Sequence, residues 1–464
     1  MRTLTRYGLA AGIAAVLIVG LAGCGGQISG NQGTKVSYST VVSFGDSLSD
    51  AGAYKVGAIN AVGGGLFTVN GITGAVGSDP APSYTWAQLV AAAAVGNVNC
   101  AARTGGFGVA VTTVAGCTNY AQGGSRVTDP SGTGHAGGAL TEPIVTQVSN
   151  YLNTMSGGRF SGNELVTVQG GANELFAQAD ILTQAATAEG NRVGATTFST
   201  TLVGLLAAGA TNPATAAQAI GLAMATEAAR SGSTSDSIVN AAIVAAVTAG
   251  YTSAASSSVY GPIVASAQTA AVAAGNAAGA QYAATTGAGI ALAGMAAAAT
   301  QLSDSVKNMI ALGAKHVVVT NLPDVSLTPY AYSTITVTNG VTDNSTQQLV
   351  LAMTRAFNEK LKADLTGVSK VLFVDVFTEN QKQIASPSQF GLSNVRDVAC
   401  NLSYGVNPLA TPTSPGSSLA CNSSNLITGN TSRYLFADGV HPTPYGHKLL
   451  AQLVTKELVL AGWL

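Results

Sequence analysis

The residues best suited to covalent chemistry in this 464-residue chain are a serine near its start and an aspartate and a histidine near its end. Ser47 follows a short β-forming run, residues 41–44, and the turn residue Gly45. This pattern predicts a strand that ends just before Ser47, with Asp46 capping a helix that begins near it. A hydroxyl at such a junction is accessible, and a helix N-terminus stabilises a developing anion. Ser47 is therefore a candidate nucleophile, and a simple capped turn is the alternative.

A serine nucleophile needs a base that takes its proton, and histidine suits this role. His441 lies three residues after Asp438 in the segment Asp-Gly-Val-His-Pro, and Pro442 prevents a helix from continuing through it. Both side chains can therefore extend from one loop, where the Asp438 carboxylate can orient the imidazole. Structural or solvated roles are expected for the other histidines, which are His135, His316 and His447.

Four segments carry a resemblance to a known family. Residues 44–52 read Phe-Gly-Asp-Ser-Leu-Ser-Asp-Ala-Gly, and residues 119–127, 170–174 and 438–442 follow in a fixed order. The first segment resembles the first block of the GDSL (SGNH) esterase and lipase family, and the other three resemble its remaining blocks. The likeness spans most of the chain after residue 40.

The resemblance implies a site and an order of roles. Ser47, Asp438 and His441 correspond to the catalytic triad of the family. The oxyanion donors would be the backbone N–H groups of Ser47 and Gly124 and the side-chain amide of Asn173, with Gly123 as the alternative to Gly124. The chain departs from the family pattern at Glu174, where aspartate is usual, and in a long insertion after that segment.

The same resemblance implies a carboxylic ester hydrolase (lipase or esterase) that works through an acyl-enzyme on Ser47 and uses no cofactor. An ester or lipid would be its substrate. A carbohydrate O-deacetylase, a lysophospholipase or an acyltransferase would use the same site, so these alternatives stay open. A non-enzymatic alternative is a surface lipoprotein that serves adhesion or structure and carries an idle site.

Composition and the N-terminus restrict partners and location. A net charge of -1 and only 9% charged residues argue against nucleic-acid binding. Residues 1–23 contain two arginines and a short apolar run, and Cys24 follows Leu-Ala-Gly. This resembles a bacterial lipoprotein signal, which implies acylation of Cys24, a flexible tether over 24–39 and a lipid anchor in the outer membrane or cell envelope. An ordinary secretory peptide is the alternative.

The four remaining cysteines form an even set in an exported chain, which favours two disulfides. Four cysteines permit three connectivities, and short loops close most easily. We therefore predict the pairs Cys100 with Cys117 and Cys400 with Cys421. A metal site is not expected, because neither pair has the spacing of a zinc site and no histidine is close in the sequence.

Hydrophobic periodicity predicts an α/β domain over residues 40–464. Strands are expected at 165–168, 316–320 and 371–376, and helices at 86–94, 346–365 and from 444 to near the C-terminus. We predict a three-layer αβα fold of the SGNH (flavodoxin-like) type, with a mostly parallel sheet of about five strands. The Ala- and Gly-rich residues 177–301 are expected to form a helical insertion, either a lid over the site or a remote bundle. The sequence does not indicate an oligomeric state.

Overall fold

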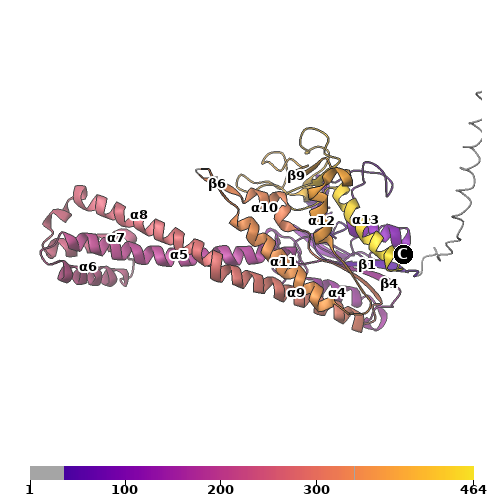
Figure 1. Cartoon of the computed structure of the whole chain (residues 1–464), viewed down its shortest axis with the longest axis horizontal. Coiled ribbons are helices and arrows are strands. Elements are labelled where there is room, and N and C mark those ends of the chain that lie inside the picture. Colours follow the sequence, from indigo (N-terminus) through magenta and orange to yellow (C-terminus); the bar gives the residue numbers. More distant parts are fainter. Residues whose placement is uncertain (1–35, 339) are drawn as a thin grey trace, which may run out of the picture.

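The computed structural model describes residues 36–338 and 340–464 (Figure 1). The predicted signal peptide (1–23), Cys24 and most of the predicted tether (24–39) lie outside the described residues.

The sheet that positions the site has four parallel strands in the order β1-β4-β5-β8. Each strand is a nearly continuous apolar run, as expected for a parallel sheet that is buried on both faces. The strands are β1 (Thr40–Phe44), β4 (Glu164–Val168), β5 (His316–Thr320) and β8 (Val371–Val374). The strand expected at 371–376 ends early because Asp375 caps the following helix, its side chain accepting the N–H of Thr378.

Helices cover both faces of this sheet, which confirms the predicted three-layer fold. Val42 and Val166 face a core that contains side chains of α4, α9 and α11. Val41 and Leu165, one residue earlier on the same strands, face a second core with α3 and α13. The helices are α3 (Trp86–Val95), α4 (Ile144–Leu152), α9 (Ala288–Ala311), α11 (Ser345–Leu365) and α13 (Pro444–Leu460).

The sheet has four strands where about five were expected, and a short bridged segment lies beside β1. Asn119 forms a parallel bridge with Ser43, whose N–H donates to the carbonyl of Thr118. The hydrogen bonds continue as far as Gln122, whose N–H donates to the carbonyl of Gly45, but no strand forms because the chain is diverted on both sides. Cys117 is joined to Cys100, and Gly123 begins a tight loop.

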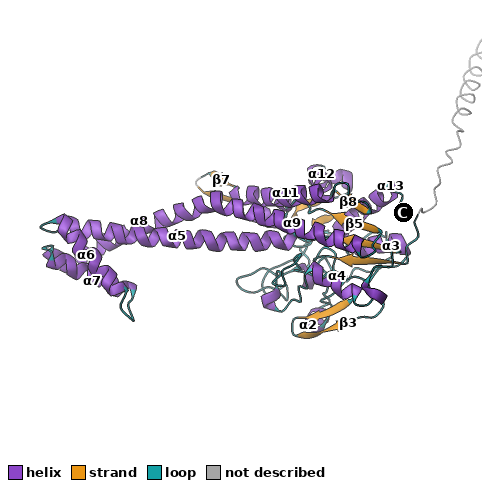
Figure 2. Ribbon diagram, turned by 90° about the horizontal axis from the view of Figure 1, so that it is seen from below, coloured by secondary structure: helices purple, strands orange, loops and turns teal. Residues whose placement is uncertain are grey.

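The insertion is a helical stalk that extends away from the sheet domain (Figure 1, Figure 2). Helix α5 runs outward, and α8 returns beside it and continues through a π-helical segment into α9. Helices α6 and α7 lie at the tip, far from the strand ends, so the insertion is a projecting bundle and not a closed lid. The bounds are α5 (Ala172–Ala208), α6 (Pro213–Ala228), α7 (Ser235–Thr248), α8 (Ser257–Tyr282) and the π segment (Ala283–Gly287).

Glycines let the two long helices of the stalk approach closely. A Cβ atom on Gly190 would lie 2.8 Å from the carbonyl oxygen of Gly275, and one on Gly275 would lie 2.7 Å from that of Gly190. Small residues at such a seam allow backbone-to-backbone packing. The continuous helix Ser257–Ala311 is long and apolar enough to cross a membrane by length and composition alone, but here it packs on α5 and α11.

The remaining elements lie around the sheet and connect its layers. The hairpin β2–β3 and the parallel pair β9–β10 flank the site, and both predicted disulfides, Cys100–Cys117 and Cys400–Cys421, are confirmed. The bounds are α2 (Gly57–Ala61), β2 (Arg103–Gly106), β3 (Val109–Thr113), α10 (Pro329–Ser333), β6 (Thr336–Thr338), β7 (Val341–Asp343), α12 (Val376–Ala385), β9 (Asn394–Val398) and β10 (Tyr434–Phe436).

Candidate active site

Ser47 lies in a turn directly after β1, and the predicted helix at this position is wrong. Asp46 Oδ1 accepts the N–H of Leu48, and Asp50 Oδ1 accepts the N–H groups of Gly52 and Ala53. These local bonds take backbone donors that would otherwise stay free at a helix start, so the chain turns instead of winding into a helix. Ser47 is therefore not the first residue of a helix of its own.

His441 and Asp438 occupy a short closed loop between β10 and α13. An antiparallel bridge joins Phe436 to Pro442, and Thr443 caps α13 by accepting the N–H of Gly446. Within the loop, the Nδ1 atom of His441 lies 2.8 Å from Oδ2 and 2.9 Å from Oδ1 of Asp438. The carboxylate therefore fixes the orientation of the imidazole.

The structure brings Ser47 to this loop, although 394 residues separate it from His441. The Oγ atom of Ser47 lies 2.8 Å from Nε2 of His441. A continuous chain of hydrogen bonds thus runs from the Ser47 hydroxyl through both imidazole nitrogens to Asp438. The ring of Phe67 packs against that of His441, with 4.9 Å between their centroids, and limits its rotation.

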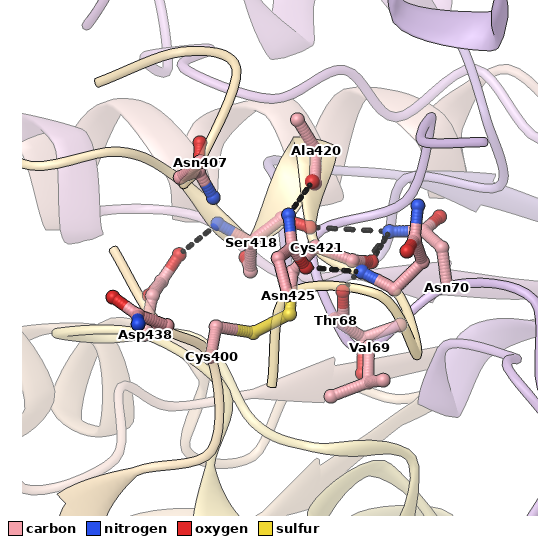
Figure 3. Close-up of a disulfide and its surroundings, with 12 residues drawn as sticks. Thr68, Val69, Asn70, Cys400, Asn407, Ser418, Ala420, Cys421, Asn425 and Asp438 are labelled. Atoms are coloured by element: carbon pink, nitrogen blue, oxygen red, sulfur yellow. Dashed lines mark hydrogen bonds between the residues drawn. A yellow bond between two sulfur atoms is a disulfide. The ribbon is translucent and has the colours of Figure 1, made fainter. Parts of the chain in front are cut away.

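Asp438 is held as a carboxylate. Burial alone would raise its pKa, but the nearby His441 and hydrogen bonds from His441, Ser418 and Val440 outweigh burial and lower the pKa below its usual range. Ser418 is a specific contributor, because its backbone N–H donates to Oδ2 at 2.9 Å. Figure 3 shows this contact next to the Cys400–Cys421 disulfide.

Gly124 lies in the tight loop that follows Gly123, and only glycine fits at this position. Its φ is +81°, and a Cβ atom would lie 2.0 Å from the carbonyl oxygen of Thr133. The N–H of Gly123 donates to Asp50 Oδ2 at 2.9 Å, so it is already used. Within the described residues, the N–H groups of Gly124 and Ser47 have no hydrogen-bond acceptor.

Asn173 lies in the first turn of α5, where the stalk leaves the end of β4. Its Nδ2 atom donates to the carbonyl of Ser125 at 2.9 Å, and Glu174 Oε1 accepts the N–H of Val127 at 2.6 Å. The first turn of α5 therefore holds the loop that contains Gly124. One hydrogen of the Asn173 amide group is still available for another acceptor.

Three buried carboxyl groups surround this loop and the Ser47 turn. Burial raises the pKa of Asp46 and of Asp50 to about 6, and that of Glu174 to about 7. Oε1 of Glu174 is 3.8 Å from Nε of Arg126, too far for a hydrogen bond. The three carboxyl groups accept hydrogen bonds from backbone N–H groups and so orient them. Each lies in a buried environment that disfavours its negative charge.

The other histidines lie apart from the hydrogen-bonded chain. His447 is fully buried in α13, where its Nδ1 accepts the N–H of Trp86, and burial lowers its pKa to about 3. His316 packs at the start of β5 against Tyr38, and His135 contacts Thr141. Among residues 36–338 and 340–464, no cluster of His, Cys, Asp and Glu side chains is arranged to hold a metal ion.

Sequence reasoning missed several residues that support the site. Phe67 lies in an irregular loop and Ser418 begins a three-residue 3-10 helix, and no periodic pattern in the sequence marks either residue. Gln147 is a third such residue: it exchanges two hydrogen bonds with the backbone of Gly45, each 2.8 Å long, from helix α4. Only the folded arrangement shows that these side chains and N–H groups hold the turn of Ser47 and the loop of His441.

The sequence model of the family described as GDSL-like Lipase/Acylhydrolase matches residues 209–454, more than half of the chain. The chain belongs to this GDSL family. The matched residues include Asp438 and His441 and begin after Ser47, Gly124 and Asn173.

Relatives of this GDSL chain occur in Arabidopsis thaliana. One GDSL esterase/lipase is 29% identical over 153 residues, which are 32% of this chain and 39% of that protein. Another is 28% identical over 157 residues, which are 32% of this chain and 40% of that protein. The anther-specific proline-rich protein APG is 31% identical over 110 residues, 22% of this chain and 18% of its own length. The chain thus spans about two fifths or less of these curated relatives.

Proposed function

We propose that this protein hydrolyses carboxylic esters through an acyl-enzyme on Ser47. The observation that carries the proposal is the chain of short hydrogen bonds from Ser47 Oγ through His441 to Asp438. Serine is a weak nucleophile alone and is activated when a base accepts its proton and a third group orients that base. Family membership supports the same chemistry.

In the proposed reaction, Ser47 Oγ attacks the ester carbonyl carbon while its proton passes to His441 Nε2. The imidazolium, stabilised by Asp438, then protonates the leaving alcohol as the C–O bond breaks. Water attacks the acyl-enzyme, again giving its proton to His441, and the carboxylic acid leaves as Ser47 recovers its proton. The Ser47 proton leaves with the alcohol and water replaces it, so the enzyme returns to its starting state without a cofactor.

The negative oxygen of each tetrahedral intermediate needs hydrogen-bond donors. We assign these roles to the backbone N–H groups of Ser47 and Gly124 and to the amide of Asn173. The two backbone groups are without an internal acceptor among the described residues, and Asn173 keeps one amide hydrogen. Each such donor typically contributes about 2.7–4 kcal/mol to transition-state stabilisation.

We also propose an exported location for the protein. Two disulfides fit an oxidising compartment, and the sequence of residues 1–24 fits a lipoprotein signal with acylation at Cys24. Mass analysis of the cell-associated protein tests this proposal: an acylated Cys24 at a new N-terminus supports it, and an intact or differently cleaved N-terminus contradicts it.

The first experiment measures hydrolysis of p-nitrophenyl esters from acetate to palmitate by protein that begins at Gln27, beside its Ser47→Ala variant. Serine-dependent turnover is expected, together with covalent labelling of Ser47 by a fluorophosphonate. Turnover confined to acetate would favour the O-deacetylase alternative, and transfer to an added alcohol would favour an acyltransferase. No turnover on any ester and no labelling would contradict the proposal and favour a structural lipoprotein.

A further inference from the structure

A long groove runs along one side of the stalk, outside the hydrogen-bonded site. It has a volume of about 1220 Å³ and lies between α5 and α8, from the tip helices to α10 and α11. At the tip it is lined by Phe198 and Ile238, and at the base by Ala179, Tyr330 and Leu349. None of its lining residues carries a charge.

The composition of the stalk explains why the groove is open. Helices α5 and α8 are joined by a seam of glycine and alanine, with Gly190 against Gly275 and Ala186 against Gly279. Side chains beside the seam are short, such as Thr187 and Ala280, and cannot fill the space that the two helices leave. A stalk needed only for rigidity would fill this space with larger apolar side chains, because packed interiors leave few voids.

The base of the groove lies beside the candidate active site. Tyr330, which lines the groove, donates its backbone N–H to the carbonyl of Gly439 at 2.9 Å, next to Asp438. On α5, Ala179 is six residues after Asn173, about 9 Å along the helix axis. Tyr330 therefore connects the base of the groove to the loop that carries Asp438 and His441.

We propose that the groove binds the acyl chain of a long-chain ester, and this inference rests on the proposed ester hydrolysis. From Ala179 to Ser199, two lining residues of α5, the groove runs about 30 Å, which equals the hydrocarbon thickness of a bilayer and twice that of one leaflet. The inner half is long enough for one acyl chain. An uncharged lining suits a neutral chain and offers nothing to an ionic ligand.

Hydrophobic binding predicts how rate depends on chain length. Full burial of one methylene group of the acyl chain increases affinity about fourfold. Because one side of the groove is open, we expect an increase of about twofold for each methylene group. We expect kcat/KM for the dodecanoate ester to exceed that for acetate by at least about tenfold.

Tryptophan substitutions at exposed lining positions test the site without disturbing the helix seam. Thr183 and Thr187 line the groove one helical turn apart, whereas exposed Ala188 lies outside it. Thr183→Trp and Thr187→Trp should reduce kcat/KM for dodecanoate at least about tenfold and leave acetate within about twofold. Thr183→Trp, nearer the site, should exclude shorter chains than Thr187→Trp, and Ala188→Trp should change neither ester.

Binding of a fluorescent dodecanoic acid to Ser47→Ala protein gives a readout that does not depend on turnover. The Ser47→Ala background should bind this probe, and adding Thr187→Trp should weaken binding at least about tenfold. Unchanged probe binding and chain-length preference in both tryptophan variants would overturn the groove proposal. An equal loss of kcat/KM on acetate and dodecanoate in the tryptophan variants would also overturn it. Absence of turnover on every ester of the series, with no fluorophosphonate labelling of Ser47 in the unmodified protein, would instead contradict the proposed ester hydrolysis.

Discussion

The backbone N–H of Ser418 donates to Oδ2 of Asp438 at 2.9 Å, and so couples a disulfide-bonded loop to the acid of the candidate triad. Cys421, three residues later, is bonded to Cys400, and Asn70 Nδ2 donates to the carbonyls of both Ser418 and Cys421 (Figure 3). The position of this N–H therefore depends on covalent and hydrogen-bond constraints outside the sequence motif.

Removal of this disulfide should reduce both stability and kcat. The double variant Cys400→Ser/Cys421→Ser opens a loop with a sequence separation of 21, which the chain-entropy model values at roughly 3 kcal/mol of unfolding free energy. Because Ser418 then holds Asp438 less firmly, kcat should also fall several-fold. Urea unfolding and ester hydrolysis at a temperature where the variant is folded measure the two effects.

The other disulfide provides the control. Cys100→Ser/Cys117→Ser opens a loop of similar separation, 17, and should lose similar stability. Among the described residues, none of residues 100–117 makes a hydrogen bond to Asp438 or His441, so kcat of the folded variant should stay within about twofold. Equal losses of kcat in the two double variants would mean that Ser418 has no specific influence on Asp438.

Two histidines in neighbouring positions offer a second test. His441→Ala should reduce kcat/KM for p-nitrophenyl butyrate at least about 10⁴-fold, because Ser47 loses its proton acceptor. His447→Ala should keep kcat of the folded protein, although it should lose about 1–3 kcal/mol of stability because the buried N–H of Trp86 loses its acceptor. A large fall in kcat for His447→Ala with unchanged kcat for His441→Ala would assign the base to the other residue.

The sequence predicted those parts of the molecule that local pattern controls. Strands β4 and β5 and helices α3 and α11 follow from apolar runs, periodicity and caps, and they lie where expected within a residue or two. The order of the motif segments also predicted that Ser47, Asp438 and His441 belong to one site. Parallel strands place their carboxyl ends at one edge, which brings such distant segments together.

The sequence did not predict features that depend on competition between local and tertiary bonds. Near Ser47, carboxylates of Asp46 and Asp50 capture backbone N–H groups, so a turn replaces the expected helix. Beside β1, Asn119 makes isolated bridges to Ser43 and Ala101 and belongs to no strand, so the sheet has four strands where about five were expected. The direction of the stalk depends on the angle at which α5 leaves the end of β4. Amino-acid composition does not specify this angle, so the sequence did not decide between a lid over the site and a projecting bundle.

Asn173 provides a test of the oxyanion assignment. Asn173→Ala removes the amide that holds the Ser125 carbonyl and, in the proposed mechanism, one donor to the oxyanion. We expect kcat to fall about 10²–10³-fold with little change in KM, because this bond strengthens in the transition state. A raised KM with unchanged kcat would show that Asn173 contributes only to substrate binding.

Glu174 predicts an unusual dependence of stability on pH. Burial raises its pKa from 4.5 to about 7, so the unfolded chain loses this proton first as pH rises. The protonated Glu174 side chain favours the folded state fully below pH 4.5. This contribution to the free energy of unfolding falls by about 3 kcal/mol as pH rises from about 4.5 to 7. Asp46 and Asp50 act in the same sense up to about pH 6, so only a difference between variants isolates Glu174.

Glu174→Gln keeps an oxygen acceptor for the N–H of Val127 but removes the ionisable proton. Relative to the unmodified protein, this variant should therefore gain unfolding free energy as pH rises from 5 to 8, when urea unfolding is measured at both values. Glu189→Gln, on the exposed surface of the same helix, should show no such gain because its pKa is lowered rather than raised by the hydrogen bond from Arg192. If the difference between Glu174→Gln and the unmodified protein is constant across this range, Glu174 is already ionised at pH 5, and Arg126 compensates its charge more fully than the 3.8 Å separation indicates.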